Sequence, residues 1–325
     1  MSCVLRRRAA GSDGAKLEGG ARGALLIAYP SAVDKCSVTL LASLGCLVLG
    51  LGSSGATDSV SVPVPEVELG RTGTQDLAAT LAGVNGVAHY PVPPLSGRQI
   101  TQLQRGNVVR IREVPEDNEG PQRVVGLVTT DHDKEALWLA LRDRHWTAAE
   151  ELTEVLLEGH SSWPRIWYQH LDAPRPFSDR HYVLRIEDSP GLALATGGAC
   201  WEHWWTLKED GPEVARVALA SGRIPDLDLA KTEGAVYVPV NDGAWLVCDL
   251  EGGQTLLAYH VRFVAGGRIP DRLIADYGMA TLGSVLRKVV ERAADVKEHY
   301  SGDHYGIPGG DGPDIPLFGS VGDER

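Results

Sequence analysis

Histidine and acidic side chains lie close together at two points of the sequence where a metal ion could be bound. One is the run Asp131, His132 and Asp133, and the other is EHYSGDH at residues 298–304. The first run lies between a predicted strand and a predicted helix, where an aspartate commonly caps the helix N-terminus. The second lies in a tail rich in glycine and proline. We therefore expect neither run to be a metal site.

Sequence motifs that mark enzymes are scarce. The chain contains no HExxH, GxSxG or P-loop motif, and no GxGxxG motif after a predicted strand. These motifs supply a metal-bound water, an activated serine or a phosphate cradle. We therefore predict no cofactor and no metal, and we assign no catalytic residue.

The stretch DAPRPFSDRHYV, residues 172–183, places two prolines and several polar residues in front of a predicted strand. Pro174 and Pro176 favour an extended turn. Asp179 and Arg180 are expected to pair locally or to cap that turn. Alternation along the following strand places His181, Val183 and Arg185 on one face and Tyr182 and Leu184 on the other.

A second strand, within residues 197–208, is rich in tryptophan. Alternation places Trp201, His203 and Trp205 on one face, and Glu202 and Trp204 on the other. Such rings can line a cavity or fill a core. One of the two sets is expected to line a cavity, and the sequence does not say which.

Composition limits the class of protein. The 325 residues include 43 acidic and 31 basic side chains, and the net charge of −12 disfavours a nucleic-acid partner. The five cysteines form no CxxC pair. Cys200 and Cys248 lie in strand-like runs, where we expect buried free thiols.

Four segments are predicted along the chain. Residues 1–56 contain an apolar run at 37–52 of about 15 residues, a length typical of a signal peptide. We expect export, with a retained membrane anchor or an untargeted N-terminus as alternatives. Residues 57–94 are predicted to be a mostly disordered linker with one short helix. A compact domain follows at 95–298, and 299–325 is predicted to be a flexible tail.

The compact domain is predicted to be α+β. A helix, two strands and a second helix are followed by a long antiparallel meander, whose last turns are NDG at 241–243 and EGGQ at 251–254. An amphipathic helix of about 30 residues, the longest in the chain, ends the domain. The economical arrangement curls the sheet around this helix, which can leave a cavity between them.

Three stretches resemble the START (StAR-related lipid-transfer) family, within the Bet v 1-like helix-grip superfamily (SRPBCC). They are PRPFSDRHYVLR at 174–185, VYVPVNDGAWLV at 236–247 and AYHVRFVAGGRIPDRLI at 258–274. The resemblance covers residues 95–298. It implies the helix-grip fold, a curved antiparallel sheet wrapped around a long C-terminal helix.

The resemblance also implies a ligand site. It places a polar pair at His170 and Arg185 in an otherwise apolar cavity, where an arginine needs a partner or an anionic head group. The loop at 265–271 resembles a lid, with Gly266, Gly267 and Ile269. The remaining candidate lining residues are Tyr168, Trp201, His203, Trp205, Tyr259, Met279 and Leu282.

The predicted function is a START-like binding module that holds a lipid or another hydrophobic small molecule, with lipid transfer as an extension. A polyketide cyclase, aromatase or hydrolase on the same fold is the alternative, and His170, Arg185 and Tyr259 could serve it. A module that only binds other proteins is a third hypothesis. We expect a monomer that contacts membranes transiently.

Overall fold

A computed structural model describes residues 73–115, 120–142, 152–159, 164–173, 175–299 and 307–315. The predicted signal-peptide-like segment at 1–56 lies outside the described residues, as do residues 57–72 of the predicted linker. No helix in the described part of the chain is both long enough and apolar enough to cross a membrane.

In the described residues nine strands form one sheet, more than the seven or so that alternation predicts. Its order is β1-β2-β9-β8-β6-β5-β4-β3, with antiparallel neighbours throughout, and β7 pairs with β5 in parallel. The strands are β1 (Val109–Glu113), β2 (Arg123–Thr130), β3 (Leu152–Glu158), β4 (Arg165–Leu171), β5 (Arg180–Asp188), β6 (Cys200–Leu207), β7 (Val236–Tyr237), β8 (Val240–Asp249) and β9 (Thr255–Val264).

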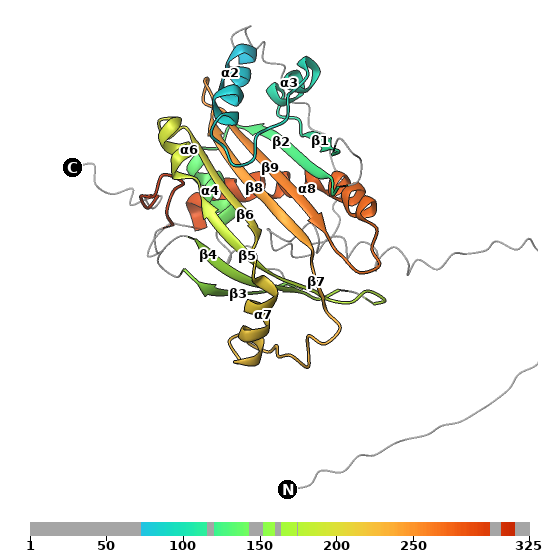
Figure 1. Ribbon diagram of the computed structural model, residues 1–325. Coiled ribbons are helices and arrows are strands. Elements are labelled where there is room, and N and C mark those ends of the chain that lie inside the picture. Colours follow the sequence, from blue (N-terminus) through green and yellow to red (C-terminus); the bar gives the residue numbers. More distant parts are fainter. Residues whose placement is uncertain are drawn as a thin grey trace, which may run out of the picture.

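Six α-helices surround this sheet in the described residues (Figure 1). They are α2 (Gly73–Asn85), α3 (Gly97–Gln104), α4 (Lys134–Arg142), α6 (Pro190–Ala195), α7 (Gly211–Ala220) and α8 (Asp271–His299), and α8 is the longest. The sheet curves around α8, so the chain has the predicted α+β helix-grip fold.

The six helices lie on two sides of the sheet. We call the side covered by α4 and α8 the inner face, and the opposite side the outer face. Figure 1 shows α8 crossing behind the sheet and α7 lying against the strands at the β3 end.

Strand alternation decides which side chains reach α8. On β9, Tyr259 and Phe263 belong to the inner cluster that includes the α8 residues Leu282 and Val285. Gly126 of β2 lies on the same face, and a Cβ atom there would stand 2.6 Å from the Leu282 side chain. The missing side chain therefore lets α8 approach β2 closely.

The outer face is covered at both ends of the sheet. One of the covering segments was predicted to be part of a mostly disordered linker. Residues 73–94 pack onto the sheet and do not form a loose connection, since Leu77 and Val84 of α2 join an outer cluster with Leu127 and Leu246. The backbone N–H groups of residues 89 and 90 also donate to Glu202. The apolar side of the predicted short helix thus packs against the outer face of the sheet. At the other end of the sheet, α7 packs against β5.

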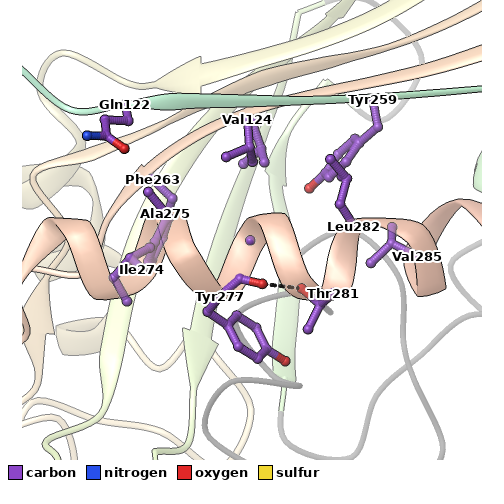
Figure 2. Close-up of a pocket in the computed structure, with 12 residues that line it drawn as sticks. Gln122, Val124, Tyr259, Phe263, Ile274, Ala275, Tyr277, Thr281, Leu282 and Val285 are labelled. Carbon is purple, nitrogen blue, oxygen red and sulfur yellow. Dashed lines mark hydrogen bonds between the residues drawn. The ribbon is translucent and has the colours of Figure 1, made fainter. Parts of the chain in front are cut away.

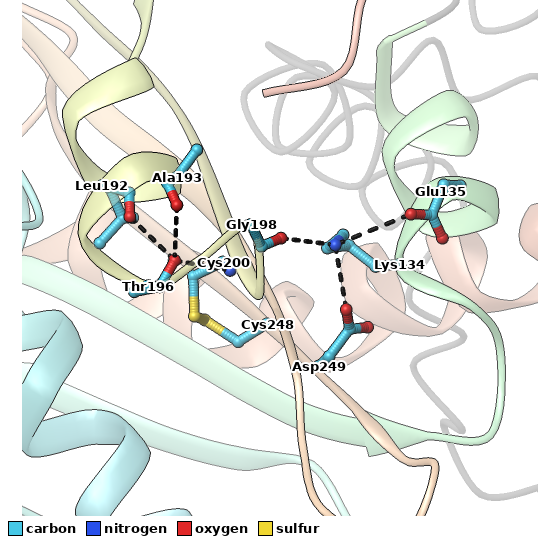
Figure 3. A network of polar contacts seen from close by, with 9 residues as sticks. All are labelled: Lys134, Glu135, Leu192, Ala193, Thr196, Gly198, Cys200, Cys248 and Asp249. Atoms are coloured by element: carbon cyan, nitrogen blue, oxygen red, sulfur yellow. Dashed lines mark hydrogen bonds and ion pairs between the residues drawn. A yellow bond between two sulfur atoms is a disulfide. The ribbon is translucent and has the colours of Figure 1, made fainter. Parts of the chain in front are cut away.

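Cys200 and Cys248 form a disulfide, so the prediction of free thiols is wrong. They face each other on the neighbouring strands β6 and β8, with their Cα atoms 4.1 Å apart. Figure 3 shows Lys134 nearby, whose Nζ donates to the Gly198 carbonyl at 2.7 Å and to Asp249 at 3.0 Å. The start of α4 is therefore tied to the same strand ends that the disulfide joins.

The NDG segment is not a hairpin turn. Asn241, Asp242 and Gly243 belong to β8 and pair with β9, whereas β7 pairs with β5. Asn241 accepts a hydrogen bond from Trp205 Nε1 at 3.0 Å, and Asp242 pairs with Arg262. These partners, which are distant in sequence, hold turn-forming residues in an extended strand. The EGGQ segment does connect β8 to β9, as predicted.

Part of the predicted tail also contacts the domain. The Pro308 carbonyl accepts a hydrogen bond from Trp138 Nε1 at 3.0 Å, and Ile315 is buried in the inner cluster. Residues 307–315 are therefore packed, which differs from the flexible tail that was predicted. Their two isoleucines provide the apolar contact, because Ile307 packs against the same cluster.

Candidate functional site

A small cavity lies between the sheet and the N-terminal half of α8. Its volume is about 40 Å³. Figure 2 shows side chains from β2, β9 and α8 converging on it. The lining residues are Gln122, Val124, Tyr259, Val261, Phe263, Ile274, Ala275, Tyr277, Gly278, Thr281, Leu282 and Val285. The wall is mostly apolar, which suits a hydrophobic guest.

One polar atom in this wall has no partner. The Gln122 Oε1 atom is buried, and it makes no hydrogen bond within the described residues. Leaving a buried acceptor unpaired costs on the order of 1–3 kcal/mol. In Figure 2 the Gln122 side chain lies at the end of the cavity near Phe263 and Ala275. A donor group on a ligand would satisfy this oxygen.

An aromatic group continues the inner face beside the cavity. Tyr259 stacks on Trp245 with ring centroids 4.2 Å apart, and on Trp205 at 6.0 Å. A Cβ atom at Gly243 would stand 2.5 Å from the Trp205 ring, so this glycine gives the indole its space. The three rings form a rigid wall next to the space under α8.

A buried charged cluster lies further along the inner face. Asp188 accepts from Arg142 and lies 2.7 Å from His203 Nδ1. Burial acts to raise the pKa of Asp188, but Arg142 and His203 hold that pKa below its ordinary value. The carboxylate is therefore ionised and paired, which is the usual state of a buried charge.

The loop between β9 and α8 contains the three predicted lid residues. Gly266 and Gly267 have φ of +67° and +66°, a conformation that favours glycine. Ile269 is buried. Arg180 donates to the carbonyls of Ala265 and Gly266, each at 3.2 Å. The loop is thus fastened to the start of β5 by one side chain.

The structure places most of the predicted lining residues on the inner face. Tyr259 and Leu282 line the cavity, and Met279 packs against the inner cluster. Trp201 and Trp205 belong to that cluster, and the His203 ring contacts Trp138 of α4. Trp201, His203 and Trp205 therefore lie on the face covered by α4 and α8, although none of them lines the cavity. Trp204 lies on the outer face, where it stacks on His89.

Three predicted residues lie on the outer face instead. Tyr168 belongs to the cluster under α7, and His170 follows it at the next alternate position of β4. Arg185 is half exposed and pairs with Glu187. The proposed pair of His170 and Arg185 is therefore wrong as a cavity pair. Alternation fixes both residues to the same face, and that face is the one that α8 does not cover.

Several lining residues were not identified from the sequence, although some left a signal. Ile274, Tyr277, Thr281 and Val285 lie on the apolar side of the predicted terminal helix. Val124, Val261 and Phe263 follow from alternation once Tyr259 is placed on the inner face. Gln122 left no signal, because it precedes β2 and its burial depends on α8.

Comparisons with known proteins find distant similarity to solved structures. No family model and no curated protein matches the sequence. Among solved structures, human STARD10 is 13% identical with a TM-score of 0.46, and covers 74% of this chain and 84% of its own. The human StarD13 lipid transfer and protein localization domain is 15% identical, with a TM-score of 0.42 and coverage of 62% and 98%.

A third similar structure is an enzyme, the Zhui aromatase/cyclase from Streptomyces. It is 14% identical, with a TM-score of 0.33 and coverage of 53% of this chain and 93% of its own. All three TM-scores are below 0.5. The assignment of the helix-grip fold therefore rests on the strand order and on α8.

Proposed function

We propose that this chain binds a hydrophobic small molecule, such as a lipid, between the sheet and the N-terminal half of α8. The observation that carries the proposal is the apolar cavity there, with the unpartnered Gln122 oxygen at one end. Apolar surface buried on a ligand contributes about 25 cal/mol per Å². A ligand hydroxyl that donates to Gln122 would fix its orientation.

The ligand must enlarge the cavity as it enters. A volume of about 40 Å³ holds water-sized molecules, whereas sites for small organic ligands are roughly 300–1,000 Å³. The proposal therefore requires α8 to move away from β2 and β9. Besides the apolar packing of Leu282 and Val285, two polar contacts near the cavity resist this movement. Arg112 pairs with Asp276 at 2.6 Å, and Arg110 donates to the Met279 carbonyl at 3.1 Å.

Two substitutions of the same size on α8 test the cavity. Ala275 lines it, whereas Ala280 is exposed on the same helix. Ala275→Leu should lower the fraction of protein that carries a ligand at least fivefold in native mass spectrometry, and Ala280→Leu should leave it unchanged. Thermal melting of both variants shows that they are folded. Equal loading of the two variants would contradict the proposal.

A third variant tests the polar end of the cavity. Gln122→Leu removes the unpartnered oxygen and keeps an apolar side chain of similar size. It should weaken binding of a long-chain alcohol about tenfold and leave binding of the matching hydrocarbon unchanged. Equal losses for both ligands would show that Gln122 does not select a donor.

Of the three residues suggested for an enzyme, two do not line the cavity. His170 and Arg185 lie on the outer face, and only Tyr259 lines the cavity. A reaction in the cavity would have to be carried by Tyr259 and groups that the sequence did not suggest. The binding proposal needs no such group.

We propose in addition that the chain is exported, acts as a monomer and touches membranes transiently during lipid transfer. The Cys200–Cys248 disulfide supports export, because disulfides persist mainly in oxidising compartments. Leu273, which is 49% exposed just after the lid loop, offers an apolar contact for a membrane. The intact mass of the protein from its native host, before and after reduction, tests both processing and the disulfide.

A further inference from the structure

Three potential metal ligands lie together on the outer face, at the turn between β4 and β5. They are His170 at the end of β4, Asp172 just after it, and Asp179 just before β5. One ligand atom from each lies within 4.8 Å of the others. This turn belongs to the proline-containing stretch at residues 172–183. It does not line the cavity under α8.

His170 is the observation that points to a ligand. Its side chain is 2% exposed, and neither ring nitrogen makes a hydrogen bond to any described residue. Nδ1 lies 3.3 Å from an oxygen of Asp172, and Nε2 lies 4.0 Å from an oxygen of Asp179. A buried imidazole nitrogen without a hydrogen-bond partner is costly, and a bound metal ion would remove that cost.

The spacing of the donors suits a metal ion. Zinc bonds to nitrogen and oxygen are about 2.0–2.2 Å long, so tetrahedral ligand atoms stand about 3.3–3.6 Å apart. The observed donors lie within 4.8 Å of one another, so a contraction of about 1.5 Å at most would bring them to that spacing. Imidazole together with carboxylates favours first-row divalent transition ions.

The surroundings can support an ion. Asp179 Oδ1 accepts the Ala173 backbone N–H at 2.8 Å, which orients the carboxylate, while the Asp172 side chain is 69% exposed and leaves a route to solvent. His181 faces His170 across the strand pair, and its Nδ1 lies 3.4 Å from the Tyr168 hydroxyl. The positive neighbour is Arg180, which donates to backbone carbonyls.

We propose that His170, Asp172 and Asp179 bind a divalent transition-metal ion such as Zn²⁺, with solvent completing its coordination. The ion joins the two ends of the 172–179 turn. Because Arg180 follows Asp179 and holds the lid loop, this turn is also the anchor of the loop between β9 and α8. The site is independent of the ligand cavity, which lies on the inner face.

Calorimetry with ZnCl₂ on the full chain, after removal of metal with a chelator, tests the proposal. The unmodified chain should bind one equivalent. The double variant Asp172→Asn and Asp179→Asn should bind at least tenfold more weakly. Asp210→Asn with Glu213→Gln removes two exposed acids elsewhere, and should leave binding unchanged. Equal binding by both double variants, or no binding by the unmodified chain, would overturn the proposal.

A Co²⁺ titration adds a readout of ligation that does not depend on affinity alone. The unmodified chain should give visible absorption bands of Co²⁺ held by protein ligands, and the Asp172→Asn and Asp179→Asn variant should lack them. Asparagine keeps the shape of each side chain, so folding is expected to be retained and circular dichroism checks it. If no band forms and His170 is seen by NMR to carry a proton between the carboxylates, the cation is a proton and the metal proposal fails.

Discussion

The inner and outer faces of β4, β5 and β6 carry different kinds of side chain, although both faces come from the same three strands. The inner face presents Tyr182, Leu184 and Trp205 to the space occupied by α4 and α8. The outer face presents polar groups such as His170 and Glu202 beside the apolar residues Tyr168 and Val183 under α7. A residue of these strands can therefore reach the cavity only if it lies on the inner face, whichever sequence motif contains it.

The largest expected difference between the faces comes from two neighbouring tryptophans. Trp205 is 3% exposed on the inner face, whereas Trp204 is partly exposed on the outer face and stacks on His89. Replacing a fully buried tryptophan by alanine costs about 3–5 kcal/mol. Trp205→Ala should therefore lower the free energy of unfolding by about that amount in urea denaturation, and Trp204→Ala by about 1 kcal/mol. Similar losses would show that the inner wall is not the core of the fold.

A smaller effect on the free energy of unfolding depends on pH and comes from His260 on the outer face. His260 is fully buried there near Tyr90 and Arg123, and burial followed by the charge of Arg123 lowers its pKa from 6.5 to about 3. The folded state keeps it neutral, while the unfolded state binds a proton near pH 6.5. Its contribution to stability is therefore present above pH 6.5 and is lost as the pH falls.

The loss attributed to His260 should be about 2 kcal/mol between pH 7 and pH 5. It is measured as the difference between the unmodified chain and His260→Phe in urea denaturation at both pH values. Other histidines, including His181, titrate in both proteins and cancel in this comparison. Parallel pH profiles for the two proteins would contradict the assignment.

The smallest effect is expected at Arg185. Its side chain is 49% exposed and pairs with Glu187, and such surface pairs contribute about 0–1 kcal/mol. Arg185→Ala should change the free energy of unfolding by less than about 1 kcal/mol and leave ligand loading in native mass spectrometry unchanged. A large loss of ligand would show that Arg185 contributes to the binding site. It would contradict the assignment of ligand binding to the inner face.

Patterns that are local in sequence predicted the fold well. Alternation located most strands, and the apolar stripe located α8, whose stripe residues Ile274, Leu282 and Val289 are buried. One member of that predicted stripe, Leu273, is exposed, because it lies in the first turn before α8 reaches the sheet. Residues 152–158 form β3, although their sequence LTEVLLE does not alternate regularly between apolar and polar residues.

Features that depend on distant partners were not predicted. Cys200 and Cys248 are separated by 48 residues, and only the register of β6 and β8 brings them together. The pairing of His170 with Asp172 and Asp179 depends on a turn that folds back onto the strand end. Alternation grouped the residues of each strand correctly, but assigning a group to the inner face requires knowing where α8 lies.

Labelling with a photoreactive long-chain alcohol tests the central claim most directly, because it reports which face of the sheet holds the ligand. The full chain is irradiated with the bound probe, digested and mapped by mass spectrometry. The account predicts labels on the inner-face segments that line the cavity, residues 259–263 of β9 and 274–285 of α8. Labels concentrated on α7 and the outer side of β4 and β5, with none on α8, would contradict it.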